Sequence, residues 1–223
     1  LHDALPISKG NFLWAISSVS DNYTTTSGMG IDSAGNAYVC GNFYDSVLLG
    51  NTMLYEMGAG NYNGDIYLAK YDKNGKLKWA SRGGGYSYEI PHYLQSDGTG
   101  NLAMTGYYYD TMYWGVKFIV SSNSENIFTL MLDSSGNPQW LNDMGSDANT
   151  DNGFSCDIDA QGNVYVCGYY LDSMFAGSIK LVSKGNEDIY AVKYNKTGKA
   201  VWAVSAGGKE SDGALGLCHS TNS

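Results

Sequence analysis

Short apolar runs alternate with polar turns along the whole chain. Residues 65–71 are typical, because Tyr67 and Ala69 fall on one face of an extended chain while Ile66 and Leu68 fall on the other. Runs of this length, rich in Tyr, Val and Ile and bounded by Gly, Asn and Asp, predict β-strands. Because this strand is apolar on both faces, we expect it to be buried between two neighbouring layers.

The strands belong to a repeated unit. Residues 65–79 return as residues 126–140 and 188–202, and residues 32–41 return as residues 97–106 and 159–168. The period is 61 to 65 residues, as shown by the recurring tryptophans Trp14, Trp79, Trp140 and Trp202. An internal period of this kind indicates a repeat architecture.

Each unit contains two hairpins with recognisable turns. The first hairpin turns through Asp-x-x-Gly, where glycine supplies the positive φ that closes the turn. We expect this conformation at Gly35, Gly100 and Gly162. The second hairpin ends on the recurring tryptophan. The length of the unit varies mainly between the two hairpins, and this partly apolar connection is expected to fold back as an extra small loop or strand pair.

Four strands per unit at constant spacing are typical of a β-propeller blade. The predicted fold class is all-β, a β-propeller fragment of four-stranded blades with about three complete blades and flanking partial ones. The complete blades span approximately residues 26–82, 90–143 and 153–206 of a partial propeller over residues 11–223, and residues 11–18 and 212–223 belong to partial blades. Residues 1–10 match no repeat and are interpreted as an extraneous or linker segment.

The repeated motifs resemble those of the SBBP β-propeller repeat family. The family pattern Asp-x-x-Gly-Asn-x-Tyr-Val-x-Gly matches residues 32–41, and its following strand and Gly-x-x-x-Trp element match residues 65–71 and 75–79. The third unit matches from residue 159 to residue 202. The middle unit departs from the pattern, with Leu-Ala-Met in place of Tyr-Val and Met-Leu in place of Lys-Tyr. The resemblance covers about residues 11–218.

This resemblance implies a bacterial protein that is extracellular or attached to the cell surface. The family shares no catalytic motif, so the resemblance implies neither a catalytic residue nor a cofactor. The expected function is a non-catalytic repeat module that binds a protein or a glycan, or acts as a scaffold. The alternative is part of a propeller enzyme or a quinoprotein-like domain, because residues 72–79 are also similar to quinoprotein blades, in which the tryptophan docks between neighbouring blades.

Charge and hydropathy narrow the range of partners. The net charge is −9, which disfavours nucleic acid and anionic membranes because both are bound by clustered Lys and Arg. No apolar run approaches the roughly 18 residues of a spanning helix, so membrane insertion is not expected. An open arc of blades leaves apolar faces and edges unpaired, so the fragment is expected to self-associate.

Candidate ligand-binding residues lie where tyrosines crowd beside an aspartate. Tyr108 with Asp110 and Tyr170 with Asp172 occupy matching positions in two units. In surface loops, flat tyrosine rings beside carboxylates would suit a sugar or a protein surface. The competing interpretation is that the aspartates make turns and the tyrosines fill the interfaces between blades.

No metal site or acid–base pair is predicted. Asp157 and Asp159 resemble part of a calcium loop, but no bidentate Glu follows at the required spacing, so a structural turn is favoured. His92 and His219 have no triad-like neighbours and are interpreted as solvated loop residues.

The four cysteines show no metal-ligand spacing. Counting back from the turn places Cys156 opposite Cys167, within reach of a disulfide in a secreted setting. Met29 occupies the matching place opposite Cys40, so pairing is not a property of the repeat. A Cys156–Cys167 disulfide and two free thiols therefore remain alternatives.

Overall fold

The protein is all-β. A computed structural model describes residues 7–8, 11–58, 63–146 and 150–220, and these residues form antiparallel sheets without a helix. Most of the segment 1–10 lies outside the described residues. Residues 7–8 form the short strand β1 (Ile7–Ser8), which pairs with β2 (Asn11–Phe12).

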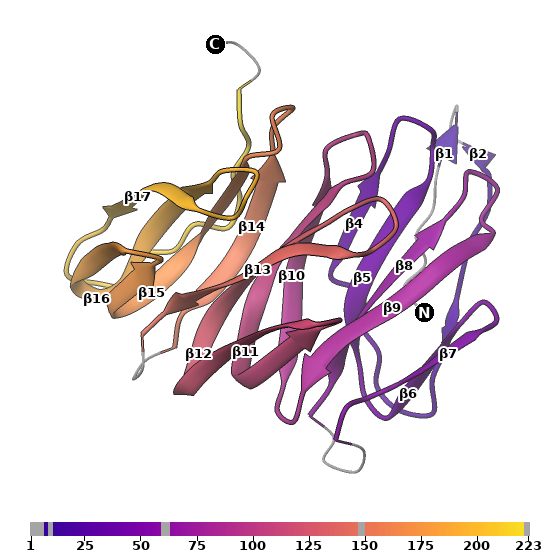
Figure 1. Ribbon diagram of the computed structural model, residues 1–223, viewed down its shortest axis with the longest axis horizontal. Helices are drawn as coiled ribbons and strands as arrows, with labels where there is room; N and C mark the ends of the chain where they lie inside the picture. The colour runs from indigo at the N-terminus through magenta and orange to yellow at the C-terminus, as the bar shows by residue number, and fades with distance from the viewer. Residues whose placement is uncertain (1–6, 9–10, 59–62, 147–149, 221–223) are drawn as a thin grey trace.

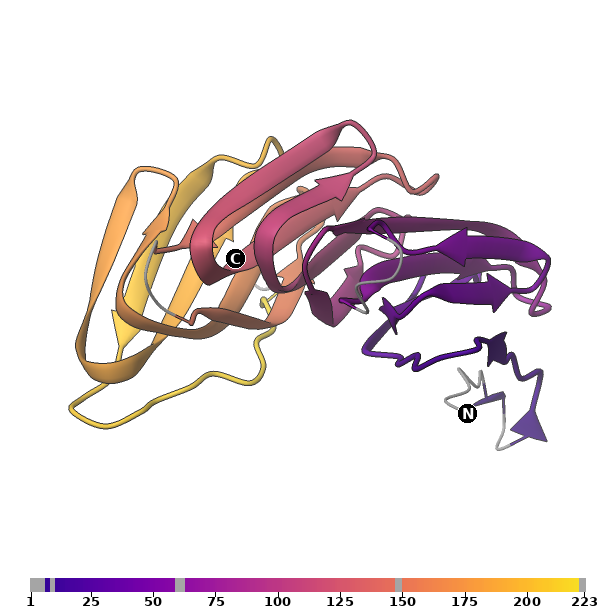
Figure 2. The same ribbon diagram turned by 90° about the horizontal axis from the view of Figure 1, so that it is seen from below.

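Twelve strands form three successive four-stranded units, each pairing its strands in chain order. The first unit contains β4 (Gly28–Ile31), β5 (Ala37–Phe43), β8 (Asp65–Tyr71) and β9 (Leu77–Gly85). The second contains β10 (Glu89–Ser96), β11 (Leu102–Trp114), β12 (Lys117–Leu132) and β13 (Pro138–Gly145). The third contains β14 (Asn152–Ile158), β15 (Val164–Ala176), β16 (Ile179–Tyr194) and β17 (Ala200–Ala206). Both ribbon views show the units in chain order across the molecule (Figures 1 and 2).

The first hairpin of each unit closes as expected. Gly35, Gly100 and Gly162 have φ values of 80°, 103° and 78°, which confirms the predicted conformation. In the first unit the Asp32 carboxylate accepts the N–H groups of Ala34 and Asn36, so the turn is fixed by its own aspartate. The two hairpins together give each unit its four strands.

The connection between the hairpins also forms strands, as predicted. In the second and third units it is a continuation of the neighbouring strands, with Asp110 and Asp172 left out of the register as bulges. In the first unit it is a separate hairpin of β6 (Ser46–Leu49) and β7 (Thr52–Tyr55). We call residues 46–55, 111–120 and 173–182 the back hairpins.

Each back hairpin bonds to the strand that precedes its own unit. Met112 of β11 pairs with Gly85 of β9, and Ala176 of β15 pairs with Met144 of β13. In the same way β6 pairs with β3 (Ser18–Val19), which precedes the first unit. Neighbouring units are therefore joined by backbone hydrogen bonds as well as by side chains.

The hydrophobic core lies mainly between units. One cluster joins Leu68 and Tyr38 of the first unit to Leu94 and Phe128 of the second, and another joins Ile127 of the second unit to side chains of the third. The third cluster lies in the first unit and is covered by Trp14 and Ile16 from the preceding segment. The strand that the sequence predicted to be buried on both faces, β8, is buried along almost its whole length.

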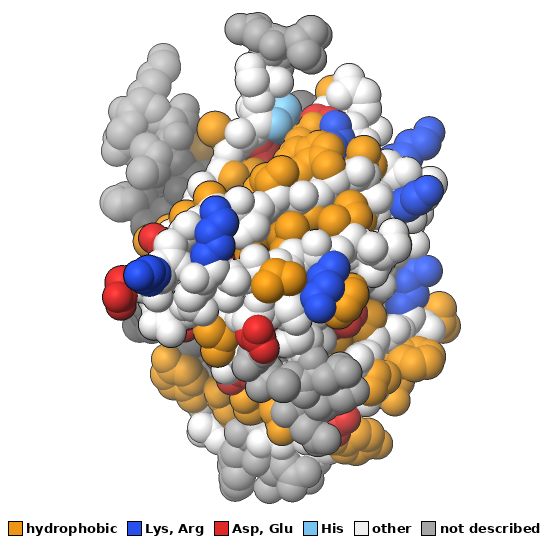
Figure 3. Space-filling model, turned by 90° about the vertical axis from the view of Figure 1, so that its left-hand side faces the viewer, with side chains coloured by type: hydrophobic (Ala, Val, Ile, Leu, Met, Phe, Trp, Pro, Cys, Tyr) orange, Lys and Arg blue, Asp and Glu red, His pale blue; other side chains and the backbone are white. Residues whose placement is uncertain are grey.

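The recurring tryptophans cover these interfaces. The Trp14 indole N–H donates to the Lys73 carbonyl at 2.9 Å, and that of Trp140 donates to the Lys196 carbonyl at 3.2 Å. Trp140 is 7% exposed, whereas Trp202, in the third unit, is 38% exposed. Figure 3 faces the third unit and shows its apolar side chains in rows between lysines.

Cys156 and Cys167 do not pair, which corrects the sequence-based register. Cys156 lies opposite Val166, and Cys167 lies opposite Ser155. The reason is the turn: the Asp159 N–H bonds to the Asn163 carbonyl, so it encloses one residue fewer than the sequence count assumed. Because successive side chains of a strand point to opposite faces, a shift of one residue separates the two thiols. Both are free and buried.

Candidate binding surface

The four residues proposed as a ligand surface have structural roles. Tyr108 and Tyr170 lie within strands and are 0% exposed, so they do not form a surface. The Tyr108 hydroxyl donates to Asp143 Oδ1 at 2.7 Å, and the Tyr170 hydroxyl bonds to Ser205 Oγ at 2.7 Å. The interpretation of these tyrosines as surface-loop ligands is therefore corrected in favour of packing between strands.

The aspartates beside them shape the chain. Asp110 and Asp172 have φ values of 68° and 61°, and Asp45 has 65° at the matching position of the first unit. Aspartate tolerates this left-handed conformation better than most residues. The Asp110 N–H donates to Ser121 Oγ at 2.9 Å, which holds the bulge. These side chains are exposed, and the aspartate recurs because all three units adopt the same left-handed conformation at this position.

A different set of aromatic side chains does reach the surface. Tyr107 and Tyr169 flank the buried tyrosines, and alternation along the strand turns them to the other side. Their neighbours are rings from two adjoining units. We call this set the aromatic cluster, and its members, all partly exposed, are Tyr88, His92, Tyr107, Tyr109, Phe154 and Tyr169.

The rings form a continuous series of contacts across the junction of the second and third units. His92 and Phe154 are stacked, with centroids 5.1 Å apart and an interplanar angle of 8°. His92 also meets Tyr107 at 5.4 Å, and Phe154 meets Tyr169 at 5.5 Å. These rings therefore add a side-chain contact to the backbone pairing and the hydrophobic cluster that already join the second and third units.

Two β-bulges explain why His92 and Phe154 meet. The pairing of β10 with β11 shifts between Pro91 and Tyr93, and that of β14 with β15 shifts between Gly153 and Ser155. The residue left over in each strand is His92 or Phe154, and a bulge re-aims the side chain that it carries. His92 is thus a half-buried strand residue, which corrects its interpretation as a solvated loop histidine.

The electrostatics of the aromatic cluster favour neutral rings beside a carboxylate. Burial lowers the pKa of His92, and its Nδ1 lies 3.1 Å from the Gly153 carbonyl, so a neutral imidazole can donate there. The Tyr88 hydroxyl donates to Glu125 Oε1 at 2.7 Å. Burial and then this hydrogen bond raise the pKa of Tyr88. The surface offers flat apolar faces, phenol groups and one carboxylate.

The side chains of Asp157, Asp159 and His219 form hydrogen bonds within the fold. The Asp159 carboxylate accepts the N–H groups of Gln161 and Asn163, as a turn requires. Asp157 Oδ2 lies 2.8 Å from His219 Nδ1 and accepts the His219 backbone N–H, so His219 is also held. Within the described part of the chain, no group of three or more His, Cys, Asp or Glu could hold a metal ion.

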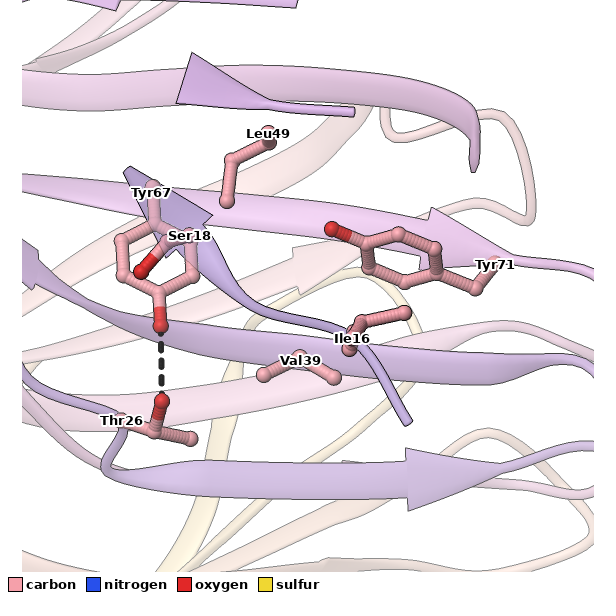
Figure 4. Close-up of a pocket in the computed structure, with 7 residues that line it drawn as sticks. All are labelled: Ile16, Ser18, Thr26, Val39, Leu49, Tyr67 and Tyr71. Carbon is pink, nitrogen blue, oxygen red and sulfur yellow. Dashed lines mark hydrogen bonds between the residues drawn. The ribbon is translucent and has the colours of Figure 1, made fainter. Parts of the chain in front are cut away.

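A small pocket under the segment that precedes the first unit does not suit a ligand. Seven residues line it, including Ile16, Val39 and Tyr71 (Figure 4). Its volume is about 20 Å³, which is room for roughly one water molecule. The hydroxyls of Thr26 and Tyr67 bond to each other across it at 2.9 Å. We interpret it as a packing gap.

The aromatic cluster could not be found from sequence periodicity alone. The useful signal was that Tyr107 and Tyr169 flank the inward tyrosine and so must face outward. The bulges that bring His92 and Phe154 together leave no comparable mark in the sequence.

No membrane-spanning helix is found in the part of the chain that the structure describes. No protein-family model and no curated protein matches this chain.

Proposed function

We propose that this chain is part of a β-propeller of the SBBP repeat type, and that it serves as a non-catalytic binding or scaffolding module outside the cell. The sequence resemblance and the three four-stranded units with their cores at the junctions support the propeller. Four-stranded units that follow one another in chain order, with hydrophobic clusters between them, are the arrangement expected of propeller blades.

The aromatic cluster is the observation that carries the binding function. Tyrosine presents a flat apolar face and a hydroxyl with little conformational entropy to lose, which suits both sugars and protein surfaces. Rings from two units contribute to one surface, so the junction itself supplies the site. The ligand expected there is a glycan or a protein segment without a strong negative charge, since Glu125 lies among the rings.

The rival function is a propeller enzyme or a quinoprotein-like domain. It would require an acid, a base or a nucleophile placed for a reaction. The aromatic cluster instead combines a histidine that donates to a backbone carbonyl with tyrosines whose pKa values are raised, including Tyr107 and Tyr169. These groups are better suited to contact than to proton transfer near neutral pH.

Arrays of glycans and surface proteins test this proposal. Tyr107→Ala and Tyr169→Ala, separately and together, should weaken capture of any ligand that the wild type retains. Tyr86→Ala is the matched control, because Tyr86 is 64% exposed and lies outside the aromatic cluster. Thermal melts should stay close to those of the wild type. Unchanged capture by the double variant would contradict the proposal.

A further inference from the structure

A second candidate site shares no residue with the aromatic cluster and lies where the first and second units meet. It is an open hollow of about 370 Å³, lined by Asn36, Lys70, Lys78, Trp79, Ser134 and Ser135. The first unit supplies the lysines, the asparagine and the indole, whereas the second unit supplies the two serines from the turn after β12. The hollow therefore exists only where the two units meet.

The two lysines of the hollow differ in their partners. Lys70 Nζ lies 3.3 Å from the Ser134 carbonyl, 4.9 Å from the centre of the Tyr38 ring and 4.0 Å from Asp32 Oδ2. This ammonium is thus held in place at the base of the hollow. Lys78 is exposed on β9, so its charge is open to solvent and to a ligand.

Negative charge near the hollow is already engaged. The Asp32 carboxylate accepts the N–H groups of Ala34 and Asn36 and the Tyr38 hydroxyl, the last at 3.0 Å. The Asp72 carboxylate accepts the N–H groups of Lys76 and Asn74 in its own turn, which lower its pKa. The positive charge of Lys78 lowers this pKa further. Both carboxylates face backbone donors, and the two ammonium groups remain the charges that line the hollow.

The matching positions in the second and third units show which residues of the hollow belong to the repeat and which occur only in the first unit. The tryptophan recurs as Trp140, but Met131 replaces Lys70 and Gln139 replaces Lys78. In the third unit a lysine recurs as Lys193, also 4.9 Å from a tyrosine ring, and Val201 stands where Lys78 does. The pair of lysines is therefore a property of the first unit alone. The fold does not require it, since the other units form the same strands without it.

We propose that this hollow binds an acidic saccharide, with the Trp79 indole against a sugar ring and with Lys70 and Lys78 on a carboxylate or sulfate group. An aromatic wall favours the apolar face of a pyranose. Ammonium groups form charge-assisted hydrogen bonds with the anionic substituent. The hydroxyls of Ser134 and Ser135 and the Asn36 amide supply the donors and acceptors that sugar hydroxyls need.

The site is distinct from the aromatic cluster in chemistry as well as in place. The Glu125 carboxylate lies beside the aromatic cluster, and none of the cluster's members is a lysine or arginine, which disfavours an anion. The hollow has the opposite charge. Binding of an acidic saccharide therefore neither requires nor excludes a ligand on the aromatic cluster, and the two can be tested independently.

Titration calorimetry with an oligomer of uronic acid tests the site directly, with a neutral glucan oligomer of the same length as a second probe. The wild type should bind the uronate oligomer and not the glucan, and its affinity should fall as salt is added. Lys78→Gln should weaken binding about tenfold or more, since it removes a charge-assisted contact. Lys70→Met should have a similar effect.

The controls follow from the repeat. Both substitutions place in the first unit the residues that the second unit already has, so the fold should tolerate them. Lys76→Gln is the matched control, because Lys76 is an exposed lysine of the same hairpin that does not line the hollow. If Lys76→Gln weakens binding as much as Lys78→Gln, attraction is non-specific and the site is refuted. No binding by the wild type at low salt, or equal binding of the glucan, refutes it as well.

Discussion

Trp140 and Trp202 occupy the same position in successive units but have very different surroundings. Trp140 is 7% exposed, and a Cβ placed on Gly198 of the next unit would lie 2.7 Å from its indole. Trp202 packs on Tyr165 of its own unit, with ring centroids 6.2 Å apart, and is 38% exposed. The same motif is thus a core residue or a surface residue according to the unit beside it.

Replacing each of these two tryptophans by alanine should give the largest difference in stability. Trp140→Ala should lower the free energy of unfolding by about 3–5 kcal/mol, the usual range for a buried Trp. Trp202→Ala should lower it by about 1 kcal/mol, because much of its ring is already in contact with solvent. Denaturant titration of both variants measures the difference. Equal losses would mean that Trp202 is covered in solution, for example by self-association of the kind that exposed apolar faces favour.

A second comparison concerns two acidic residues at matching positions, one at the junction of the first and second units and one after the third unit. Glu89 is 0% exposed, and an oxygen of its carboxyl group accepts the Gly85 N–H at 3.0 Å. Burial, followed by the nearby charge of Asp65, raises the pKa of Glu89 to about 10. Asp212, at the matching position, accepts the Gly208 N–H at 2.9 Å but is only half-buried.

These differences predict a dependence on pH. The unfolded chain releases the Glu89 proton near pH 4, whereas the folded protein retains it up to about pH 10. The contribution of this group to stability is therefore fully present below pH 4 and is lost as pH rises toward 10. Glu89→Gln should make the profile of unfolding free energy less steep between pH 5 and about 9. Asp65 and Asp151, whose pKa values burial raises to about 7, still contribute to the profile in this variant. Denaturant titration across this pH range measures the slope, and an unchanged slope in Glu89→Gln would contradict the role of burial.

The smallest effect concerns the turns. Gly162 has a φ of 78°, so Gly162→Ala should cost about 1 kcal/mol through backbone strain, even though Lys196 Cβ, at 3.4 Å, is the only atom near the added methyl group. Gly216 has an unstrained φ and no atom within 4 Å of an added Cβ. Gly216→Ala should therefore be close to neutral. Thermal melts of both variants test the contrast, and equal shifts would exclude strain as the cause.

The sequence predicted the strands and turns of the fold better than the register in which the strands pair. The strands, the turn glycines and the strand pair between the hairpins follow from local patterns, and the structure confirms them. The Cys156–Cys167 pairing failed because one hydrogen bond in the Asp159 turn moves the register by a residue. Local patterns fix a turn type, but a count across the turn needs its hydrogen bonds.

The binding surface was harder to predict than the fold. Tyrosines do cluster near Tyr108 and Tyr170, but the alternation of side chains along the strand buries these two and exposes their neighbours. The meeting of His92 with Phe154 depends on bulges in two different units. The hollow beside Trp79 likewise combines side chains more than fifty residues apart, and periodicity says nothing of such distant pairs.

The back hairpins have a consequence for the order of folding. Each one bonds to a strand that precedes its own unit, as Met112 does with Gly85 and Ala176 with Met144. A growing chain therefore finds its partner strand already made when a back hairpin leaves the ribosome. These partners are close in sequence, which keeps loop closure inexpensive and pairing fast. The repeat should thus assemble from its amino-terminal units onward, each completed unit serving as the template for the next.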